Sequence, residues 1–276
     1  LTSSGLFSYS NTVVPPMCLA EAVTAQTTTT TKTDTPSTTT VSQLQDSSTA
    51  TVMAMATGYS LQDYQRFVGS LRKTGYKGHI ILSVSPDLPS DTEEYLLSKQ
   101  VTIKKVSYVK CSNPILTEEE QLTATDEHSK ELVTCLHPYP SLKHRWARFP
   151  LQRDYLKECA TCTGPVLITD MRDAIFQRDP FGPEAPVVPT NTLQVFQEFH
   201  SMRTTNWLVD WPVYDCKGVK YDEPMLCSGT TIGTRSAMLE YLRVMHVEMD
   251  EWMRDPKCCC FKTNADDQSI HNYLFY

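Results

Sequence analysis

Apolar and polar positions alternate along the chain with two different periods after Thr51. Short apolar runs predict buried strands over residues 52–57, 79–84, 101–109 and 166–169. Between the first two runs, apolar residues recur at helical spacing on one face: Leu61, Tyr64, Phe67, Val68 and Leu71. Strands that alternate with helices are typical of βαβ units. The pattern therefore predicts an α/β domain with a mostly parallel central sheet flanked by helices.

Residues that cap or interrupt a helix mark the ends of the first two predicted helices. Ser60 with Asp63 has the spacing of a capping box, and Gly75 is expected to end that helix. Ser90 with Glu93 repeats the spacing before a second helix that runs to about residue 100. Both helices follow a predicted strand, as a parallel sheet requires.

The second half of the chain has helices at wider intervals. Helices are expected over 151–159 and at the C-terminus, where Asp266 or Asp267 opens the last one. The stretch 111–144 lacks a clear period and is expected to be mainly loop with one short helix. A helix after Gly233 carries a face that is expected to lie in the core: Met238, Leu239, Tyr241, Leu242, Met245, Met249 and Trp252.

The first fifty residues have a different composition from the rest. Residues 24–51 are mostly Thr and Ser, so they bury too little apolar surface to offset the entropy of ordering. They are expected to form a disordered linker or an O-glycosylated stem. The expected organisation is an N-terminal segment of unknown role over 1–23, this linker over 24–51, and one domain over 52–276.

Charge and hydropathy exclude two classes of partner. The formal net charge is −7, so the long-range field of the protein repels a polyanion, and nucleic acid is not expected as a partner. No run approaches the roughly 18 to 20 apolar residues of a bilayer span, so no membrane span is expected in this chain. The sequence opens on Leu1 without a signal pattern, and we expect that an anchor or signal is missing from this fragment.

Ten cysteines are a high number for a reducing compartment and favour disulfides. Cys159 and Cys162 have the Cys-x-x-Cys spacing that also occurs in zinc sites. A zinc site needs further ligands, and the run at 258–260 does not supply a second pair at that spacing. Disulfides or buried thiols are therefore favoured over zinc.

An acidic turn, Asp170-Met171-Arg172-Asp173, follows the predicted strand over 166–169. In open α/β sheets, ligands bind at the carboxyl ends of the strands. Two carboxylates there can hold Mg²⁺ or Mn²⁺, whose shell is usually completed by water and substrate phosphates. Spacing alone equally allows a structural turn, in which Asp170 is a cap and Asp173 pairs with an arginine.

Other phosphate-binding and hydrolytic motifs are missing from the sequence. There is no GxxxxGK[ST] loop, no GxGxxG turn after a strand, no GxSxG elbow and no HExxH helix. An aspartyl-phosphate enzyme of the haloacid dehalogenase type would have Asp-x-Asp after the strand, whereas this turn is Asp-x-x-Asp. These classes are therefore not favoured.

Three blocks, in chain order, resemble the nucleotide-diphospho-sugar transferase family of GT-A fold glycosyltransferases. Residues 166–181 resemble the metal-binding region of that family. They comprise a predicted strand, the acidic turn and then the sequence FQRDPF. Residues 226–233 (LCSGTTIG) resemble the segment that lines its donor and acceptor site, and residues 267–272 (DQSIHN) resemble its C-terminal Asp-Gln block. The likeness spans 52–276 and implies a GT-A fold.

The resemblance implies a divalent metal, Mn²⁺ or Mg²⁺. The usual acidic motif of the family is Asp-x-Asp, and counting back from the Asp-Pro-Phe block puts Asp173 on its second carboxylate and Met171 on its first. Asp173 is thus the safer metal ligand, and Asp170 is the second candidate. His271 is a further candidate for the metal and diphosphate shell.

The resemblance also implies a binding site for a nucleotide-diphosphate sugar. Thr57, Gly58 and Tyr59, at the end of the first strand, would meet the nucleotide, and Arg172 would contribute charge toward the diphosphate. Gly229 would let the backbone approach a sugar closely. Simpler roles remain open: a turn glycine at 58, a β-bulge glycine at 229, and an ion pair of Arg172 within the acidic turn.

Three residues are candidates for catalysis. Inverting transfer requires a general base on the acceptor hydroxyl, for which Asp210 and Asp267 are candidates. A retaining mechanism would instead place Asp267 or Gln268 near the anomeric carbon. A helix cap is the alternative role of Asp267.

The expected function is transfer of a sugar from a nucleotide-diphosphate sugar to a hydroxyl of a glycan or glycoprotein, with a divalent metal. A non-catalytic secreted glycan- or protein-binding module on the same fold and a sugar nucleotidyltransferase are the alternatives. The resemblance and the cysteine count together imply the Golgi lumen or another secretory compartment.

Overall fold

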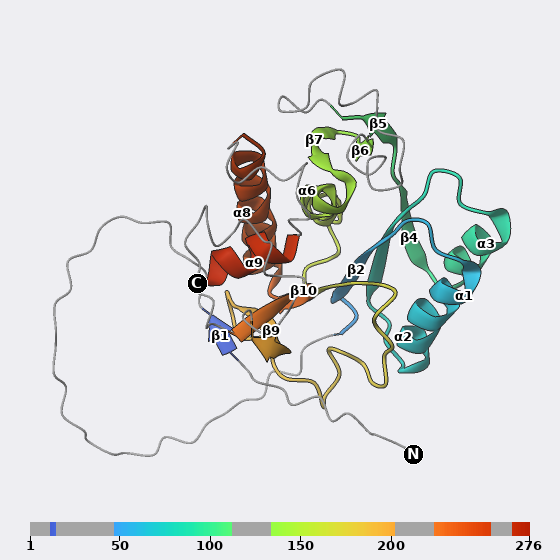
Figure 1. The fold of residues 1–276 in the computed structure, drawn as a ribbon. Coiled ribbons are helices and arrows are strands. Elements are labelled where there is room, and N and C mark those ends of the chain that lie inside the picture. Colours follow the sequence, from blue (N-terminus) through green and yellow to red (C-terminus); the bar gives the residue numbers. More distant parts are fainter. Residues whose placement is uncertain (1–11, 15–46, 112–133, 202–223, 255–266) are drawn as a thin grey trace, which may run out of the picture.

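The computed structural model describes residues 12–14, 47–111, 134–201, 224–254 and 267–276 (Figure 1). The main sheet is formed by seven strands: β1 (Thr12–Val14), β2 (Thr51–Ala56), β3 (His79–Val84), β4 (Val101–Lys105), β8 (Val166–Thr169), β9 (Leu193–Ser201) and β10 (Pro224–Gly233). A small second sheet contains β5 (Tyr108–Lys110), β6 (Thr134–Leu136) and β7 (Tyr139–Lys143). The helices are α1 (Leu61–Tyr64), the π-helical η1 (Gln65–Gly69), α2 (Ser70–Lys73), α3 (Ser90–Ser98), α6 (His144–Glu158), α8 (Arg235–Arg254) and α9 (Asp267–Phe275).

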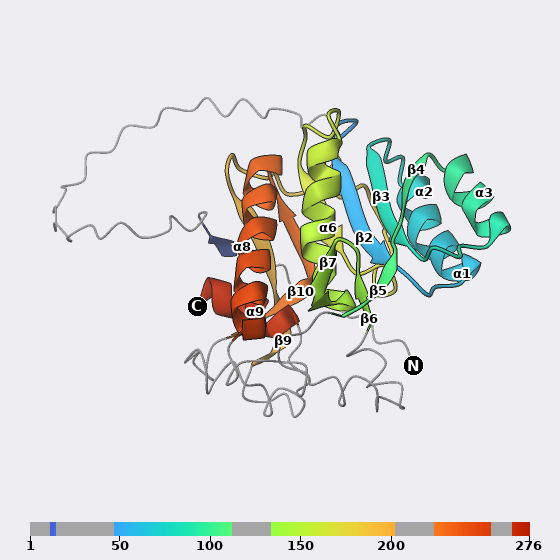
Figure 2. The ribbon, with the colours of Figure 1, turned by 90° about the horizontal axis from the view of Figure 1, so that it is seen from above.

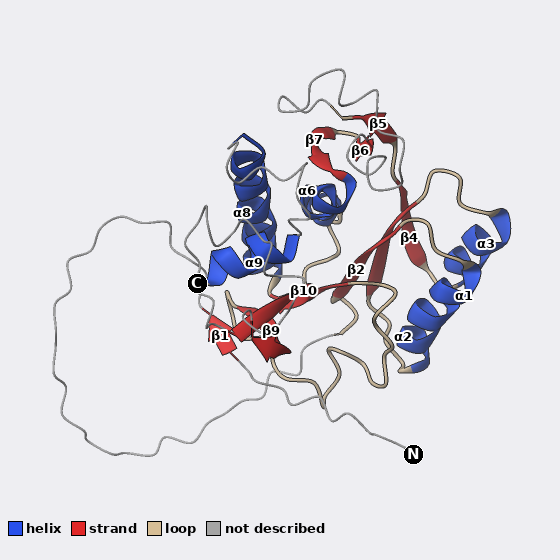
Figure 3. Ribbon diagram, in the orientation of Figure 1, coloured by secondary structure: helices blue, strands red, loops and turns tan. Residues whose placement is uncertain are grey.

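The strand order of the main sheet is β1-β9-β10-β8-β2-β3-β4. β8, β2, β3 and β4 are parallel neighbours, as βαβ units require. β10 lies antiparallel between β8 and β9, and β1 lies antiparallel to β9 at the edge. Only β1 and β10 therefore run against the other strands of this sheet, and the predicted mostly parallel sheet is confirmed (Figure 3).

Helices cover both faces of the sheet (Figures 1 and 2). Successive side chains of a strand point to opposite faces, and β2 shows this directly. Met53 belongs to the core under α6 and α8, which includes Trp146 and Trp252. Val52 and Ala54 belong to the core under α1, η1 and α3. The near-continuous apolar run of β2 thus reflects burial on both faces.

Most of the local predictions are confirmed. β2, β3 and β8 occupy the predicted strands within one residue. The first helix begins after Ser60, whose backbone N–H donates to Asp63 Oδ2 at 3.0 Å, and Gly75 follows it with a φ of 90°. The predicted apolar face of α8 is buried apart from Leu239, which is partly buried.

Four boundaries differ from the prediction. The strand predicted over 101–109 ends at Lys105, and β5 joins the second sheet. The residue before the first turn of α3 is Pro89, and Ser90 is already helical. Part of the predicted loop over 111–144 forms β6 and β7, while residues 112–133 lie outside the description.

The fourth difference is α6, which begins at His144, seven residues before the predicted start. Pro150 lies inside this helix and cannot donate the usual backbone hydrogen bond. Trp146, Phe149 and Leu151 around it are buried. Burial of these large side chains stabilises the helix despite the proline.

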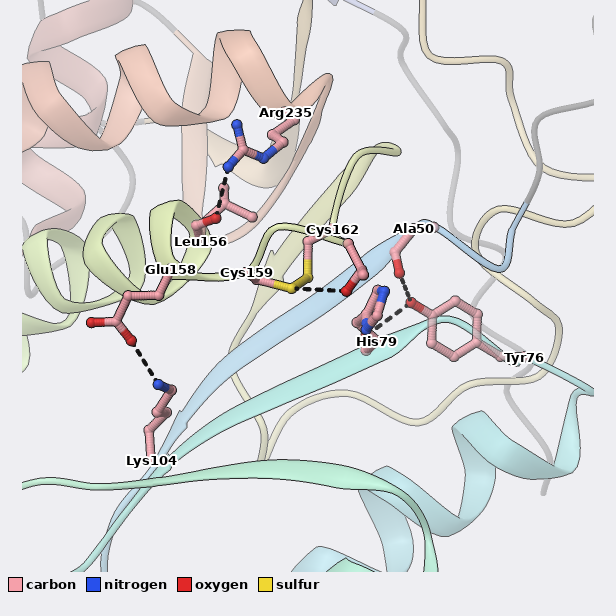
Figure 4. Close-up of a disulfide and its surroundings, with 10 residues drawn as sticks. Ala50, Tyr76, His79, Lys104, Leu156, Glu158, Cys159, Cys162 and Arg235 are labelled. Atoms are coloured by element: carbon pink, nitrogen blue, oxygen red, sulfur yellow. Dashed lines mark hydrogen bonds and ion pairs between the residues drawn. A yellow bond between two sulfur atoms is a disulfide. The ribbon is translucent and has the colours of Figure 1, made fainter.

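Two disulfides are present, Cys111–Cys135 and Cys159–Cys162 (Figure 4). The expectation of disulfides is confirmed for these two pairs. Cys227 is the free cysteine among the described residues. Within the described ranges, no helix has the length and apolar character needed to cross a bilayer.

The predicted linker lies mostly outside the described residues, which resume at Ser47. β2 starts at Thr51, and both Thr51 and the preceding Ala50 are fully buried. Gly78 is part of this packing, because a Cβ at that position would lie 2.5 Å from the backbone oxygens of Ser47 and Ala50. The start of the domain is therefore held closely against the start of β3.

We predict that Gly78→Ala lowers the free energy of unfolding by about 1–3 kcal/mol, because the new methyl group displaces backbone that has no room to move. Urea denaturation measures the change. Lys77→Ala, at the exposed neighbouring position, is the matched control and should change stability by less than about 0.5 kcal/mol. Equal stability of the two variants would show that this contact is loose.

Candidate functional site

The C-terminal edge of the parallel strands carries the acidic turn, directly after β8. The backbone N–H of Asp170 donates to the oxygen of Gly229 on β10 at 2.8 Å. This bond continues the antiparallel pairing in which Thr169 lies opposite Thr230. The Asp170 side chain is 42% exposed and is therefore accessible at the edge of the sheet.

Arg148, on α6, connects Asp170 with the C-terminal helix. Its Nη1 is paired with Asp170 Oδ1 and its Nη2 with Asp267 Oδ2. The Arg148 and Asp267 side chains are only 12% and 8% exposed. A buried charge is tolerated when it is paired and hydrogen-bonded, so the two carboxylates and the guanidinium stabilise one another. Two carboxylates singled out in the sequence, ninety-seven positions apart, are thus joined by one arginine.

Gly229 is crowded by the Asp170 carboxylate. A Cβ at Gly229 would lie 2.6 Å from Asp170 Oδ2, and the pairing of β10 with β9 shifts register between Cys227 and Thr231. A glycine is therefore required for the approach of a carboxylate as well as for an irregular strand. Gly229 thus has two structural roles, since it leaves room for the Asp170 carboxylate and lies in the irregular part of β10. Its close approach to a sugar stays a prediction.

Within the acidic turn, one side chain points into the core and two point to solvent. Met171 is fully buried in the core with the first helices, whereas the Arg172 and Asp173 side chains are 67% and 72% exposed. Arg172 Nε lies 3.6 Å from Asp173 Oδ1, which is the exposed ion pair considered from the sequence. Arg66 donates to the Arg172 backbone oxygen at 2.9 Å and thereby fixes the turn against η1.

The end of β2 faces the same turn. Burial raises the pKa of Tyr59, Arg172 lowers it, and Asp170 and Asp173 raise it through their negative charge. Tyr59, the last residue of the predicted nucleotide segment, therefore lies within electrostatic reach of the acidic turn. Gly58 has a φ of 76° and its N–H donates to Ser85 Oγ at 2.9 Å, which fits a turn glycine.

Gln268 is held by β9 and β10. Its amide nitrogen donates to Glu198 Oε1 at 2.6 Å and lies 3.2 Å from the Leu226 oxygen. Asn272, one turn later, accepts from the Leu226 N–H at 2.8 Å and donates to its oxygen at 2.9 Å. These bonds dock α9 on β10 and fix the orientation of the Gln268 amide.

His271 lies in the core instead of at the edge. It is fully buried, and Nδ1 lies 2.7 Å from the Tyr241 hydroxyl. Burial, and secondarily the positive charge of Arg148, lower the pKa of His271 to about 3. Nε2 is buried and has no hydrogen-bond partner in the described part of the chain. The imidazole is therefore neutral, and its role as a metal ligand stays a prediction.

The sequence did not point to two residues at this edge, Arg148 and Glu198, and Cys227 was included only as part of the block 226–233. Burial, and secondarily the negative charge of Glu198, raise the pKa of Cys227 to about 11, so the thiol is protonated at neutral pH. Arg148 lies between the buried residues Ala147 and Phe149. A positively charged residue among apolar neighbours was the feature of the sequence that could have indicated a buried ion pair.

Asp210, the remaining catalytic candidate, lies outside the described residues.

No family model and no curated protein matches the chain. Among solved structures, the chain is similar to the galactosyltransferase LgtC in complex with donor and acceptor sugar analogues. The TM-score is 0.50 at 13% identity, over 82% of this chain and 70% of that one. This likeness shows the fold, and the predicted GT-A fold is confirmed.

Two further similar structures have lower scores. They are core-mannan synthase A (CmsA/Ktr4) from Aspergillus fumigatus in an Mn/GDP form and the mannosyltransferase Ktr4p from S. cerevisiae in complex with GDP. Their TM-scores are 0.44 and 0.41, both at 10% identity, over 86% and 84% of this chain and 71% and 67% of theirs.

We predict that Arg148→Met and Asp267→Asn each destabilise the protein by about 3 kcal/mol. Arg148→Met leaves the buried Asp267 carboxylate without its cation, and Asp267→Asn removes the more buried of the two carboxylates that balance Arg148. The double variant should cost about 2 kcal/mol less than the sum. Urea denaturation of the four proteins gives this coupling energy. The same cycle on the more exposed pair of Lys104 and Glu158, which also includes an α6 residue, is the control and should give less than about 1 kcal/mol. If the losses of stability caused by the two substitutions simply added up in the double variant, Arg148 and Asp267 would not form a stabilising ion pair.

A second prediction concerns pH. Because the pKa of His271 is about 3 in the folded protein and about 6.5 in the unfolded chain, only the unfolded chain gains this proton between those values. The free energy of unfolding therefore falls as the pH is lowered through this window, by up to about 1.4 kcal/mol per pH unit. His271→Gln should remove this part of the slope. Urea denaturation between pH 7 and pH 4, with a chelator present, measures it, and parallel curves for the two proteins would contradict the buried neutral state.

Proposed function

We propose that this protein is a metal-dependent glycosyltransferase, which moves a sugar from a nucleotide-diphosphate sugar to a hydroxyl of a glycan or glycoprotein. The observation that carries the proposal is the pairing of Arg148 with both Asp170 and Asp267. It gathers the acidic turn and the Asp-Gln block at the C-terminal edge of a GT-A sheet, where open α/β folds bind their ligands.

The carboxylates of the acidic turn suit a hard divalent cation. Mg²⁺ and Mn²⁺ prefer oxygen ligands and keep several positions for water and phosphate. The side chains of Asp170 and Asp173 are 42% and 72% exposed, so both can offer oxygens to an ion at the edge of the sheet. The metal would act as a Lewis acid on the diphosphate and stabilise the negative charge of the leaving group. His271 would need a side-chain movement to reach this edge, since it is fully buried.

The cationic and backbone groups around the turn support binding of the donor. Arg172 places an exposed guanidinium group beside the acidic turn, and guanidinium is well suited to bidentate recognition of phosphate. Arg148 is engaged by Asp170 and Asp267 and adds positive charge behind the turn. Thr57 to Tyr59, at the end of β2, would meet the nucleotide. Tyr59 is close enough to the turn for its pKa to respond to Asp170 and Asp173.

The transfer step would use the residues at the start of α9. Glu198 and the Leu226 oxygen hold the nitrogen of the Gln268 amide, so its oxygen is the atom left to orient a substrate hydroxyl or the sugar. Asp267 is neutralised by Arg148, which favours an electrostatic role for this carboxylate. Asp210 stays a candidate general base for an inverting reaction. The anomeric configuration of the product, read by NMR, distinguishes inversion from retention.

Two disulfides are compatible with a lumenal or extracellular location. We propose the Golgi lumen or another secretory compartment. The domain of the proposed enzyme extends from about residue 52 to 276.

We predict that Asp173→Asn abolishes Mn²⁺-dependent donor binding while the fold survives, because a neutral amide at an exposed position weakens the metal site without disturbing the core. Asp170→Asn should have a smaller effect on metal binding. A panel of nucleotide sugars with Mn²⁺, followed by thermal shift, measures binding, since a ligand of the folded state alone raises the melting temperature. Glu251→Gln, the same loss of charge on the exposed face of α8, is the control.

The outcomes separate the three functions considered. A donor-dependent shift with transfer to a hydroxyl acceptor supports the glycosyltransferase. Formation of a nucleotide sugar from a nucleoside triphosphate and a sugar phosphate would identify a nucleotidyltransferase instead. No shift with any donor would favour the non-catalytic module, and full Mn²⁺-dependent binding by Asp173→Asn would contradict the assignment of this ligand.

A further inference from the structure

A second cluster of potential ligands lies at the opposite edge of the parallel strands. His79 is the first residue of β3, Cys159 directly follows α6, and Cys162 precedes β8. The two sulfurs and a ring nitrogen of His79 all lie within 4.8 Å of one another. Figure 4 shows the His79 ring beside the Cys159–Cys162 disulfide. Asp170 lies at the other end of β8, so this cluster is separate from the proposed active site.

The backbone of His79 is anchored, while its ring is not engaged. The His79 N–H donates to the Ala50 oxygen at 2.8 Å, and the Tyr76 hydroxyl lies 3.0 Å from the His79 oxygen. Among the described residues, none makes a hydrogen bond or an ion pair with the ring. The imidazole is therefore positioned toward the sulfurs with both nitrogens available.

We propose that reduction of the Cys159–Cys162 disulfide converts this cluster into a site for one zinc ion, with Cys159, Cys162 and His79 as ligands. A dithiol supplies the two electrons: its own sulfurs join in a cyclic disulfide, and the two cysteines become thiols. Zinc then displaces one proton from each thiol and binds two thiolates and the neutral imidazole.

The present geometry needs only small changes for such a site. Tetrahedral zinc with bonds of about 2.3 Å to sulfur and about 2.0 Å to nitrogen holds these ligand atoms roughly 3.5–3.8 Å apart. Opening the disulfide lets the sulfurs separate to that distance, and His79 is already within 4.8 Å of both. Ala160 and Thr161, between the cysteines, are exposed and can adjust. Three protein ligands leave the fourth position to water.

The electrostatics favour a bound cation over free thiolates. Cys159 follows the C-terminal end of a 15-residue helix, where the helix dipole is negative. Reactive Cys-x-x-Cys thiols gain their low pKa at helix N-termini, which is the reverse arrangement. The carboxylate of the preceding residue, Glu158, pairs with Lys104 at 2.7 Å and points away from the disulfide (Figure 4). A zinc ion would neutralise both thiolates and interact favourably with the end of α6.

Access for the reductant is one-sided. Cys162 is fully buried, whereas Cys159 is partly exposed. A thiolate from solvent therefore attacks the Cys159 sulfur, and Cys162 is the leaving group. The same position would be held by a disulfide under oxidising conditions and by zinc under reducing ones.

The test uses Co²⁺ as a spectroscopic probe for the zinc site. The full chain is reduced with dithiothreitol, desalted under argon and titrated with Co²⁺. Thiolate-to-cobalt charge transfer in the near ultraviolet should saturate at one Co²⁺ per chain, and Zn²⁺ should abolish it. The oxidised protein should show no such band.

Variants assign the ligands. Cys159→Ser with Cys162→Ser should abolish the band, and His79→Gln, which keeps both thiols, should weaken Co²⁺ binding by about tenfold or more. Changing Cys258, Cys259 and Cys260 to Ser is the control and should leave the band intact. The proposal is overturned if the folded, reduced wild type shows no band, if the Cys159 and Cys162 variant keeps it, or if only the control loses it. The readout involves no sugar transfer, so its result is independent of the proposed function.

Discussion

One buried arginine organises the C-terminal edge of the sheet. Arg148 is only 12% exposed, and a guanidinium in that position requires negative partners. They come from the end of β8 and the start of α9, since Asp170 and Asp267 both pair with it. Because an isolated buried charge costs several kcal/mol, the requirement for charge balance holds the three elements together. Gly229 completes the arrangement by leaving space for the Asp170 carboxylate.

α6 and β8 are joined at both of their ends. The two elements are antiparallel, so the first residues of α6 lie near the end of β8 and the last residues of α6 lie near its start. Arg148 and Asp170 make the contact at one end, and Cys159 and Cys162 make it at the other. With both ends fixed, the helix cannot slide along the strand. The position of Asp170 relative to Arg148 therefore depends on packing along the full length of α6, including Trp146 and Phe149.

Sequence reasoning succeeded where the physical cause is local. β3 and β8 follow from short apolar runs bounded by polar residues, and the face of α8 follows from helical spacing. It failed where tertiary contacts decide. Pro150 argues against a helix locally, yet burial of its neighbours keeps α6 helical from His144 onward.

The candidate site divides in the same way. Asp170, Gly229 and Asp267 were found because their residue types sit in recognisable blocks, and the structure brings them together. Arg148 and Glu198 were missed because their importance arises only from partners far away in sequence. Glu198 lies seventy positions before the Gln268 amide that it holds. No periodicity or spacing along the chain indicates such a contact.

Met171 illustrates why counting along a motif can mislead. Motif spacing puts this apolar residue where a first carboxylate is expected, which argues against metal binding. At the end of a strand, however, successive side chains point to opposite sides. Met171 fills the core beneath the turn, while Asp170, one position earlier, lies at the open edge beside Arg148. A carboxylate at position 171 would be buried without compensation, whereas Asp170 can supply a negative charge at the edge. An apolar residue at 171 next to an acid at 170 therefore gives both a filled core and a charged edge.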